Sequence, residues 1–368
     1  MSDGAAGGGM AGGGMAGDGM AGDGTVAVAE RDRLDLARLD RWMADAVPDY
    51  AGPLDYVRFA GGQSNPTYRL DTPARSYVLR RKPFGPILPS AHAVEREYRV
   101  IAGLHPTGFP VPQPFGLCED DGVIGSPFYV MEMVAGRTIW DGAMPGMAPG
   151  DVRAHYDAMI DTLAALHQTD ADAAGLGDYG RPGNYFERQV ARWTKQYRAS
   201  ETEHMAPVER LIEWLPRTLP PQTRTSIVHG DYRVDNMIYA PDGPRVIAVL
   251  DWELSTLGDP LADFSYLLMN WVTEPEGRSG VKGLAGPATG IPTIEEVVER
   301  YCRATGRDGV PQLDWYFAYN LFRLTGIVQG IKKRIIDGNA ASAKAADTAA
   351  RVGSLADAAW HFAERAGA

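Results

Sequence analysis

The sequence predicts an α+β protein with two lobes, a small β-rich lobe followed by a larger, mainly helical one. The first observation is the order of the patterns: short runs of branched and aromatic residues come before about residue 133, and helical periodicity follows. The second is a single β segment, residues 226 to 252, that interrupts the helical part. The third is the composition, because 45% hydrophobic and 23% charged residues are typical of a folded soluble chain.

The N-terminal residues form a low-complexity segment. Residues 1 to 24 repeat a five-residue unit that ends in Gly-Met, and they hold 11 of the 43 glycines. Such a segment buries too little apolar surface to offset its backbone entropy. We therefore predict a disordered Gly/Met-rich tail over 1–29, a small lobe over 30–133 and a large lobe over 134–368.

The small lobe is expected to combine antiparallel strands with two helices. Leu and Trp residues at helical spacing predict a first helix that ends before Pro48. A second helix is expected over 91–104, with Ser90 as its cap. Runs of branched and aromatic residues, separated by turn residues, predict strands over 56–59, 67–70, 77–80 and 128–131.

The large lobe is expected to be built from helices around the one β segment. An apolar face at helical spacing predicts its first helix over 151–167. Asp259 is expected to cap a later helix. Within the β segment, the turn Pro241-Asp242-Gly243 predicts a hairpin that brings Asn236 and Asp251 side by side. The remaining helices are expected over 185–198, 207–214, 260–271, 294–304 and 314–336.

Charge and composition narrow the possible partners. A net charge of −11 and a pI near 5.2 provide no basic surface of the kind that nucleic-acid binding requires. No apolar run reaches the roughly 18 to 20 residues that a membrane span needs, and the N-terminus lacks the pattern of a signal peptide. The two cysteines are too far apart for a redox pair or a zinc knuckle. We therefore expect a cytoplasmic protein with no nucleic-acid or membrane partner, and no oligomeric state follows from the sequence.

The strongest functional signal lies in and after the predicted hairpin. Residues 229–236 read HGDYRVDN, and residues 251–253 read DWE. If the hairpin forms, the carboxylates of Asp231 and Asp251 and the amide of Asn236 form an oxygen-rich cluster. Mg²⁺ is a hard cation that is usually held by one or two carboxylates together with substrate phosphates. The pattern therefore predicts a magnesium site that receives a phosphate-bearing substrate.

These two motifs resemble those of the kinase-like phosphotransferases. HGDYRVDN is similar to the HRDxxxxN catalytic loop of protein kinases, and DWE stands where the DFG metal site follows. Gly in place of Arg matches the small-molecule branch, which includes aminoglycoside phosphotransferases and choline kinases. The resemblance implies a protein-kinase-like fold with ATP as phosphoryl donor. It also implies that Asp231 orients and deprotonates an acceptor hydroxyl, while Asn236 and Asp251 hold Mg²⁺.

A glycine-containing turn in the small lobe is a candidate phosphate loop. It lies between two predicted strands and holds Gly61, Gly62, Ser64 and Asn65. The glycines would let backbone N–H groups approach phosphate oxygens, and the Ser and Asn side chains would add a hydroxyl and an amide. GGxSN turns are similar to the loop of the small-molecule branch.

The third strand of the small lobe ends in three cations. Strand alternation places Arg80 and Lys82 on one face and Arg81 on the other. By the resemblance, Arg80 takes the position of the nucleotide-binding Lys of kinases, but the choice between Arg80 and Lys82 stays open. Glu97 in the following helix resembles the Glu that pairs with this cation, with Glu95 as the alternative.

The strand over 128–131 leads into the place where kinases join their lobes. By the resemblance, backbone groups of Glu132 and Met133 would hydrogen-bond the adenine of ATP there. A buried strand without this role would look the same in sequence. This assignment therefore depends on the resemblance alone.

A finer resemblance concerns the phosphate acceptor. GGQSNPTY, VLRRKP, RQVARW, VHGDYR and VLDWELSTLG are similar to the kinase-like domain fused to some acyl-CoA dehydrogenases and to its free-standing bacterial relatives. This implies a small-molecule acceptor of the hydroxyacyl-CoA type, against an aminoglycoside-like compound for the wider family. Arg188, Arg192 and Lys195 recur at helical spacing in the large lobe, and such a basic stripe could meet the phosphates of CoA.

Two other hypotheses for the function compete with a small-molecule kinase. A catalytically inactive pseudokinase that binds nucleotide or acyl-CoA is one, although such proteins commonly lack the base or a metal ligand and this chain has Asp231, Asn236 and Asp251. A protein kinase is the other. The sequence after Asp251 has no Ala-Pro-Glu and little room for an activation loop, which disfavours it.

Overall fold

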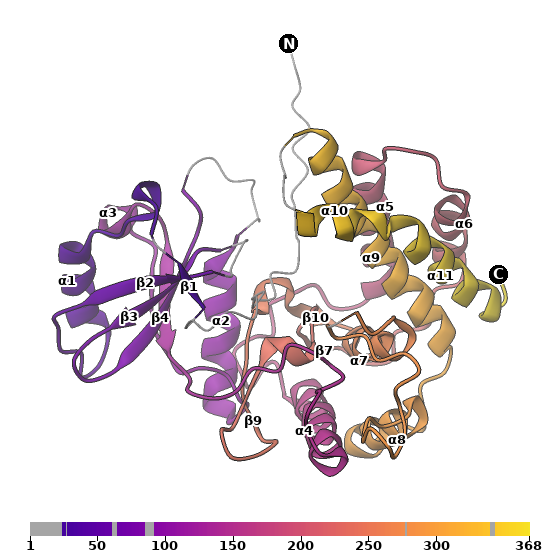
Figure 1. Ribbon diagram of the computed structural model, residues 1–368, viewed down its shortest axis with the longest axis horizontal. Coiled ribbons are helices and arrows are strands. Elements are labelled where there is room, and N and C mark those ends of the chain that lie inside the picture. Colours follow the sequence, from indigo (N-terminus) through magenta and orange to yellow (C-terminus); the bar gives the residue numbers. More distant parts are fainter. Residues whose placement is uncertain (1–23, 27, 61–64, 85–91, 277, 339–342) are drawn as a thin grey trace.

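The computed structural model describes residues 24–26, 28–60, 65–84, 92–276, 278–338 and 343–368. They fold into two lobes, with a six-stranded sheet in the small lobe and mainly helices in the large lobe (Figure 1). The predicted α+β, two-lobe architecture is therefore confirmed. Among the described helices, none is long and apolar enough to cross a membrane.

The six strands of the small lobe are antiparallel and follow the order β1-β2-β3-β4-β6-β5. Four of them coincide with the predicted strands, and β5 at the edge carries a register shift against β6. The strands are β1 (Thr25–Val26), β2 (Asp55–Phe59), β3 (Thr67–Asp71), β4 (Ser76–Arg81), β5 (Pro114–Cys118) and β6 (Phe128–Glu132).

Strand β1 lies inside the segment predicted to be a tail. Thr25 pairs with Phe59 and Val26 pairs with Arg58, so β1 extends the sheet beyond β2. The small lobe therefore starts before residue 30, and residues 1–23 and 27 lie outside the described residues. A two-residue strand is too short to produce a periodic signal in the sequence.

The two faces of the sheet pack against different helices. Alternating residues such as Tyr77 and Leu79 face helix α1 (Leu36–Ala46) and form an outer core with it. Val78 faces α2 (Val94–Leu104) and belongs to the core that continues into the large lobe. A short helix, α3 (Asp121–Ile124), packs beside α1.

Helix α2 starts later than predicted. It begins at Val94 with Ala93 at its N-cap position and without a side-chain cap, so the predicted Ser90 cap is wrong; Ser90 itself lies outside the described residues. The helix is fixed to the large lobe through Arg96. Its Nη2 donates to the Tyr179 carbonyl oxygen at 2.9 Å, and the Tyr179 hydroxyl donates to the Arg96 carbonyl oxygen at 3.1 Å. In Figure 1, α2 lies on the side of the sheet that faces the large lobe.

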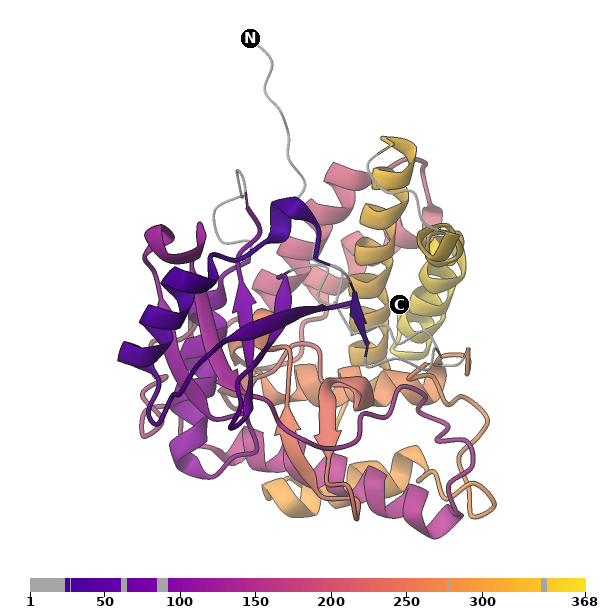
Figure 2. The same cartoon turned by 60° about the vertical axis from the view of Figure 1, so that its left-hand side comes forward.

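The predicted helices of the large lobe are present, with small shifts at their ends. The predicted helix over 260–271 ends at Leu268 and continues as a 3₁₀ turn to Val272. Two C-terminal helices, α10 and α11, were not predicted; they lie beside α9, far from the six-stranded sheet (Figures 1 and 2). The helices are α4 (Pro149–Gln168), α5 (Tyr185–Ser200), α6 (Ala206–Trp214), α7 (Pro260–Leu268), α8 (Ile294–Thr305), α9 (Leu313–Ile336), α10 (Ala343–Ala350) and α11 (Val352–Arg365).

The predicted β segment forms two separate antiparallel pairs. Strands β8 (Met237–Tyr239) and β9 (Val246–Val249) make the predicted hairpin. The Leu250 N–H donates to the Asn236 carbonyl oxygen at 2.9 Å, which places Asn236 beside the residue that precedes Asp251. The second pair joins β7 (Ser226–Val228) to β10 (Thr256–Gly258), a strand that the sequence pattern did not reveal.

Candidate active site

A cavity of about 220 Å³ lies between the two lobes. Strands β2, β3, β4 and β6 supply its wall from the small lobe, and the β8–β9 hairpin with its flanking residues supplies the wall from the large lobe. The predicted nucleotide cation, interlobe segment and metal ligands share this one cavity. The predicted site residues that line it are Arg80, Glu132, Met133, Asn236 and Asp251.

The loop that carries Asp231 follows β7 and is held by α7. The Asp263 carboxylate on α7 accepts hydrogen bonds from the backbone N–H groups of His229 and Gly230. Gly230 has a φ of +86°, and a Cβ at this position would lie 2.7 Å from the Leu254 carbonyl oxygen. Only glycine fits such a turn without strain. The chain therefore turns sharply just before Asp231.

His229 connects the two motifs. Its Nδ1 accepts the Asp231 backbone N–H at 3.1 Å, so the proton of the neutral ring belongs on Nε2. Nε2 in turn donates to the Leu250 carbonyl oxygen at 2.8 Å. The imidazole therefore fixes the distance between the Asp231 loop and the chain entering Asp251.

The Asp231 carboxylate is held by two donors. The Tyr266 hydroxyl donates to Oδ1 at 2.7 Å, and the Asn236 amide donates to Oδ2 at 3.2 Å. Burial alone would raise the pKa of Asp231, but the positive charge of Arg233, the Tyr266 hydrogen bond and the charge of Arg323 outweigh burial and lower this pKa. Asp231 therefore stays ionised at neutral pH and can accept a hydrogen bond or a proton.

Arg80 bridges the lobes. Its Nε lies 3.0 Å from Glu97 Oε2 on α2, and its Nη2 lies 3.0 Å from Asp251 Oδ1 in the large lobe. Burial opposes the charge of Arg80, but Glu97 and Asp251 raise the pKa of the guanidinium above its ordinary value. A permanent cation is thus placed next to the predicted metal ligand.

Two more polar groups fix the Glu97 carboxylate. The Asn65 amide donates to Oε1 at 2.7 Å, and the Tyr129 hydroxyl donates to Oε2 at 3.1 Å. A third carboxylate, Glu253, lies 3.7 Å from Arg80 Nη2. Burial and the negative charge of Asp251 raise the pKa of Glu253 to about 8, although the positive charge of Arg80 acts against this.

The metal ligands that the sequence predicts offer a free oxygen. Asp251 Oδ1 is occupied by Arg80, but Asp251 Oδ2 is buried and finds no hydrogen-bond partner in the described part of the chain. Asn236 lines the same cavity. A carboxylate oxygen and an amide oxygen are hard donors of the kind that Mg²⁺ takes. The side chains present therefore fit a magnesium ion.

The structure separates the two cations whose roles the sequence left open. Lys82 Nζ lies 2.8 Å from Glu95 Oε1 and does not line the cavity. Arg81 points to the opposite face of the sheet, where its Nη2 lies 3.0 Å from Asp32 Oδ1. Only Arg80 of these three cations reaches Asp251.

The structure describes only some of the other residues that were predicted to contact the nucleotide. Gly61, Gly62 and Ser64 lie outside the described residues. Asn65 is fully buried and bonded to Glu97. The Glu132 backbone N–H donates to the Gln113 carbonyl oxygen at 2.9 Å, so it is already engaged within the small lobe.

The predicted basic stripe on α5 is not a single free surface. Arg188 donates to the carbonyl oxygens of Gly183 and Arg181, and it thereby closes the loop before the helix. Arg192 and Lys195 are exposed. The stripe therefore offers two solvent-facing cations rather than three.

Three residues near Asp231 were missed by sequence reasoning. They are Asp263 and Tyr266 on α7 and Arg323 on α9. Arg323 Nη2 on α9 donates to the Gly230 carbonyl oxygen at 2.5 Å. All three come from helices whose apolar periodicity masks the polar residue among them, so no local signal identifies them.

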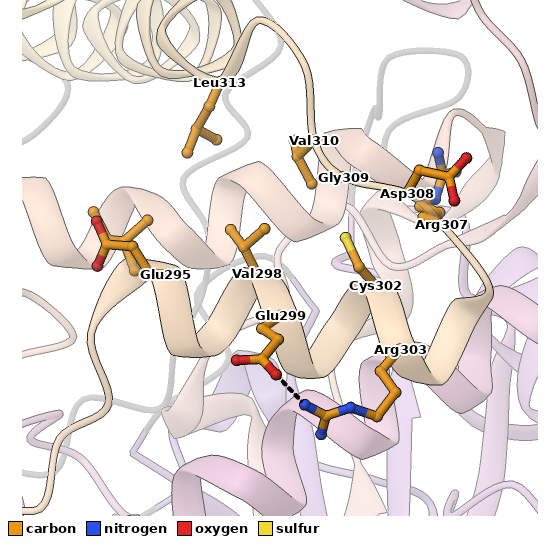
Figure 3. Close-up of a pocket in the computed structure, with 11 residues that line it drawn as sticks. Glu295, Val298, Glu299, Cys302, Arg303, Arg307, Asp308, Gly309, Val310 and Leu313 are labelled. Carbon is orange, nitrogen blue, oxygen red and sulfur yellow. Dashed lines mark hydrogen bonds and ion pairs between the residues drawn. The ribbon is translucent and has the colours of Figure 1, made fainter.

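A second hollow of about 560 Å³ lies on α8 and the loop after it (Figure 3). Its apolar lining includes Val298, Cys302 and Leu313, and an ion pair between Arg303 and Glu299 lies at its rim. It shares no lining residue with the interlobe cavity. We assign it no part in the site.

The chain is similar to known proteins in sequence and in fold. The model of the phosphotransferase enzyme family matches residues 55–316. A solved structure from Ralstonia eutropha, whose name places it among the aminoglycoside phosphotransferases, is 47% identical and superposes with a TM-score of 0.84, covering 90% of this chain and 99% of that one. A ternary complex of an aminoglycoside phosphotransferase with ADP and hygromycin B is 16% identical with a TM-score of 0.56, covering 89% and 98% of the two chains, which shows a common fold.

A curated relative has a different name. Acyl-CoA dehydrogenase family member 10 of Mus musculus is 44% identical over 319 residues, which cover 86% of this chain. The match covers only 30% of the mouse protein. The chain therefore spans less than a third of that relative's length.

Proposed function

Because the chain belongs to the phosphotransferase enzyme family, we propose that it is an ATP- and Mg²⁺-dependent O-phosphotransferase that moves the γ-phosphoryl group of ATP to a hydroxyl of a small molecule. The observation that carries the proposal is the meeting of Arg80, Asp251 and Asn236 in one cavity, with the ionised Asp231 bonded to Asn236. These groups match the needs of phosphoryl transfer, which are positioning and charge stabilisation.

The cavity offers a place for the nucleotide. Its wall includes apolar side chains from both lobes, among them Val78, Met131 and Ile238, which suit the faces of an adenine ring. Since the Glu132 N–H is engaged by Gln113, the polar edge of the base would be met by the Glu132 carbonyl or by the Met133 backbone. Arg80 would leave Asp251 Oδ1 for a phosphate oxygen, while Glu97 keeps the guanidinium in place.

The chemistry needs one base and one electrostatic clamp. Asp231 Oδ2 accepts the hydrogen bond of the acceptor hydroxyl and takes its proton as the oxygen attacks the γ-phosphorus. The bond from the γ-phosphorus to the β,γ-bridging oxygen breaks, and ADP leaves. Mg²⁺, held by Asn236 and Asp251, would neutralise phosphate charge. The Tyr266 hydroxyl donates to Asp231 Oδ1 at 2.7 Å, whereas Oδ2 receives only the longer bond of 3.2 Å from the Asn236 amide and is therefore the oxygen offered to the acceptor.

We favour an acceptor of the hydroxyacyl-CoA type over an aminoglycoside-like one. The relation to an acyl-CoA dehydrogenase family member supports this choice. Exposed Arg192 and Lys195 would attract the phosphates of CoA and would repel a polycationic aminoglycoside. The name of the Ralstonia eutropha structure favours the aminoglycoside alternative. An inactive pseudokinase is the remaining candidate.

The Asp231→Asn variant tests the mechanism. MgATP affinity, measured by calorimetry, should stay nearly unchanged, because Asp231 is not among the residues that line the nucleotide cavity. Phosphoryl transfer should fall by about 10² to 10⁴, the usual contribution of a positioned general base. Asp242→Asn, in the exposed hairpin turn, is the matched control and should keep full activity.

The acceptor screen should include hydroxyacyl-CoA thioesters and kanamycin-like aminoglycosides. Transfer to aminoglycosides alone would overturn the preferred acceptor and keep the enzyme class. Undiminished transfer by Asp231→Asn would remove the proposed mechanism. Binding of MgATP by the wild-type protein without transfer to any acceptor or to water would favour the pseudokinase.

A further inference from the structure

The peptide groups just before Asp231 are held from two sides. On one side, Asp263 of α7 accepts the Gly230 N–H at 2.8 Å. On the other side, Arg323 Nη2 of α9 donates to the Gly230 carbonyl oxygen at 2.5 Å. Asp231 is the next residue, so any rotation of these peptides moves its carboxylate. The two bonds together leave the turn little freedom.

The burial of Arg323 at this position costs free energy of folding. It is 6% exposed, and its Nε is buried without a hydrogen-bond partner in the described part of the chain. Its hydrogen bond goes to a neutral carbonyl. Burying a cation in this way opposes folding, and an apolar side chain of similar size would avoid the loss. A role in the active site accounts for its presence better than a role in stability.

Aromatic rings hold the guanidinium and connect it to the carboxylate. The Arg323 Cζ lies 4.9 Å from the ring centroid of Tyr266 and 5.4 Å from that of Trp193. These distances are within the range of cation–π attraction. The Tyr266 hydroxyl donates to Asp231 Oδ1 at 2.7 Å. Arg323 therefore reaches Asp231 by two routes, through the Gly230 carbonyl and through the Tyr266 ring.

We propose that Arg323 is a positioning residue, which fixes the Gly230 peptide and the Tyr266 ring so that the Asp231 carboxylate faces the acceptor hydroxyl. The proposal rests on the proposed function. Arg323 acts through its neighbours and does not line the nucleotide cavity. Its loss should therefore lower kcat and leave the affinity for MgATP unchanged. A displacement of about 1 Å at a reacting group can lower a rate about 100-fold.

The test compares three variants of the full chain. Arg323→Met removes the donor and the charge, while Arg323→Lys keeps the charge and a donor on a flexible stem. Leu321→Ala, a buried apolar residue of the same helix with 1% exposure, is the matched control for loss of packing. Three quantities are measured: the Kd for MgATP by calorimetry, the rate of ADP release from MgATP with water as acceptor, and hydrogen exchange in residues 229–236.

Arg323→Met should release ADP about 10- to 100-fold more slowly per folded molecule, with a MgATP Kd within about twofold of wild type. Exchange in residues 229–236 should rise in this variant. Arg323→Lys should recover part of the rate. Leu321→Ala should lower the melting temperature but keep the rate per folded molecule and the exchange of this segment.

An unchanged rate in Arg323→Met, or a loss that appears in the MgATP Kd, would overturn the proposal. If Arg323→Met does not fold, a full rate in Arg323→Lys with raised exchange in 229–236 would overturn it equally. Failure of the proposed function is separate, because it would appear as no ADP release from the wild-type protein with water or with any acceptor of the screen. In that case the exchange of residues 229–236 still decides whether Arg323 holds the loop.

Discussion

Arg80 near the end of β4 and Lys82 just after this strand lie two residues apart, yet they meet different carboxylates. Arg80 contacts Glu97 and Asp251 inside the cavity, whereas Lys82 pairs with Glu95 outside it. We expect Arg80→Met to weaken MgATP binding about 10- to 100-fold, because a charge-assisted hydrogen bond contributes about 1.5 to 3 kcal/mol. Calorimetric titration measures this change.

Lys82→Met is the matched control, since it removes a cation only two residues further along the chain. Its MgATP affinity should stay within about threefold of wild type, as expected for a partly exposed ion pair. A larger loss in Lys82→Met than in Arg80→Met would show that the cation that contacts the nucleotide lies two residues further along the chain than proposed.

Residue-level prediction from sequence succeeded where a motif fixed the spacing. The period of two in a strand was enough to separate Arg80 from Arg81, and the structure places them on opposite faces. The hairpin signal was enough to bring Asn236 close to Asp251. Tyr266 and Arg323 could not be found in this way. They reach Asp231 from separate helices, and the pairing of distant helices depends on packing that no short pattern encodes.

At the scale of the elements, the residue that caps α7, Asp259, makes the stability of the folded protein depend on pH. It caps α7 by accepting the Leu261 N–H at 2.9 Å, as predicted, and it is 2% exposed. Burial raises the pKa of Asp259 to about 6, although the Leu261 hydrogen bond and the charge of Arg307 act against this. The folded protein therefore holds the Asp259 proton to higher pH than the unfolded chain. Ionising Asp259 lowers stability as the pH rises from about 4 to about 6.

We expect Asp259→Asn to remove this pH dependence while it keeps an oxygen for the Leu261 N–H. The variant should match wild type near pH 4 and exceed its free energy of unfolding at pH 7 by up to about 3 kcal/mol. Urea unfolding at the two pH values measures the difference. Equal effects of the substitution at both pH values would contradict the assignment.

Whole elements were predicted where the pattern was long. Helices α4, α5, α8 and α9 and the central strands of the sheet all have enough residues for a clear period. Most of the elements that were not predicted are short or have a monotonous sequence, and α11, with 14 residues, is the exception. Strands β1 and β10 have two and three residues, and α10 consists largely of Ala, so neither type carries a readable apolar face.

At the scale of the whole molecule, ATP with Mg²⁺ should hold the two lobes together. Ligand that binds only the folded state stabilises it by about 2.7 kcal/mol at 100 times the Kd. We expect MgATP to raise the melting temperature more than ATP with a chelator does. Asp251→Asn should lose most of this difference, because it removes the only carboxylate of the two proposed metal ligands.

Asp242→Asn, an exposed acid in the β8–β9 turn, is the control for the loss of one negative charge and should respond to MgATP like wild type. Equal melting temperatures with ATP in the presence and absence of Mg²⁺ would contradict the metal assignment. Differential scanning fluorimetry gives all of these values in one plate.

The bonds between α2 and Tyr179 bear on how such an enzyme could be controlled. Protein kinases are switched by moving the corresponding helix, which carries its Glu toward or away from the nucleotide cation. Here Arg96, the residue before Glu97, anchors α2 to the large lobe through its two hydrogen bonds with Tyr179. A comparable movement of α2 would have to break both hydrogen bonds to Tyr179 and the ion pair between Glu97 and Arg80.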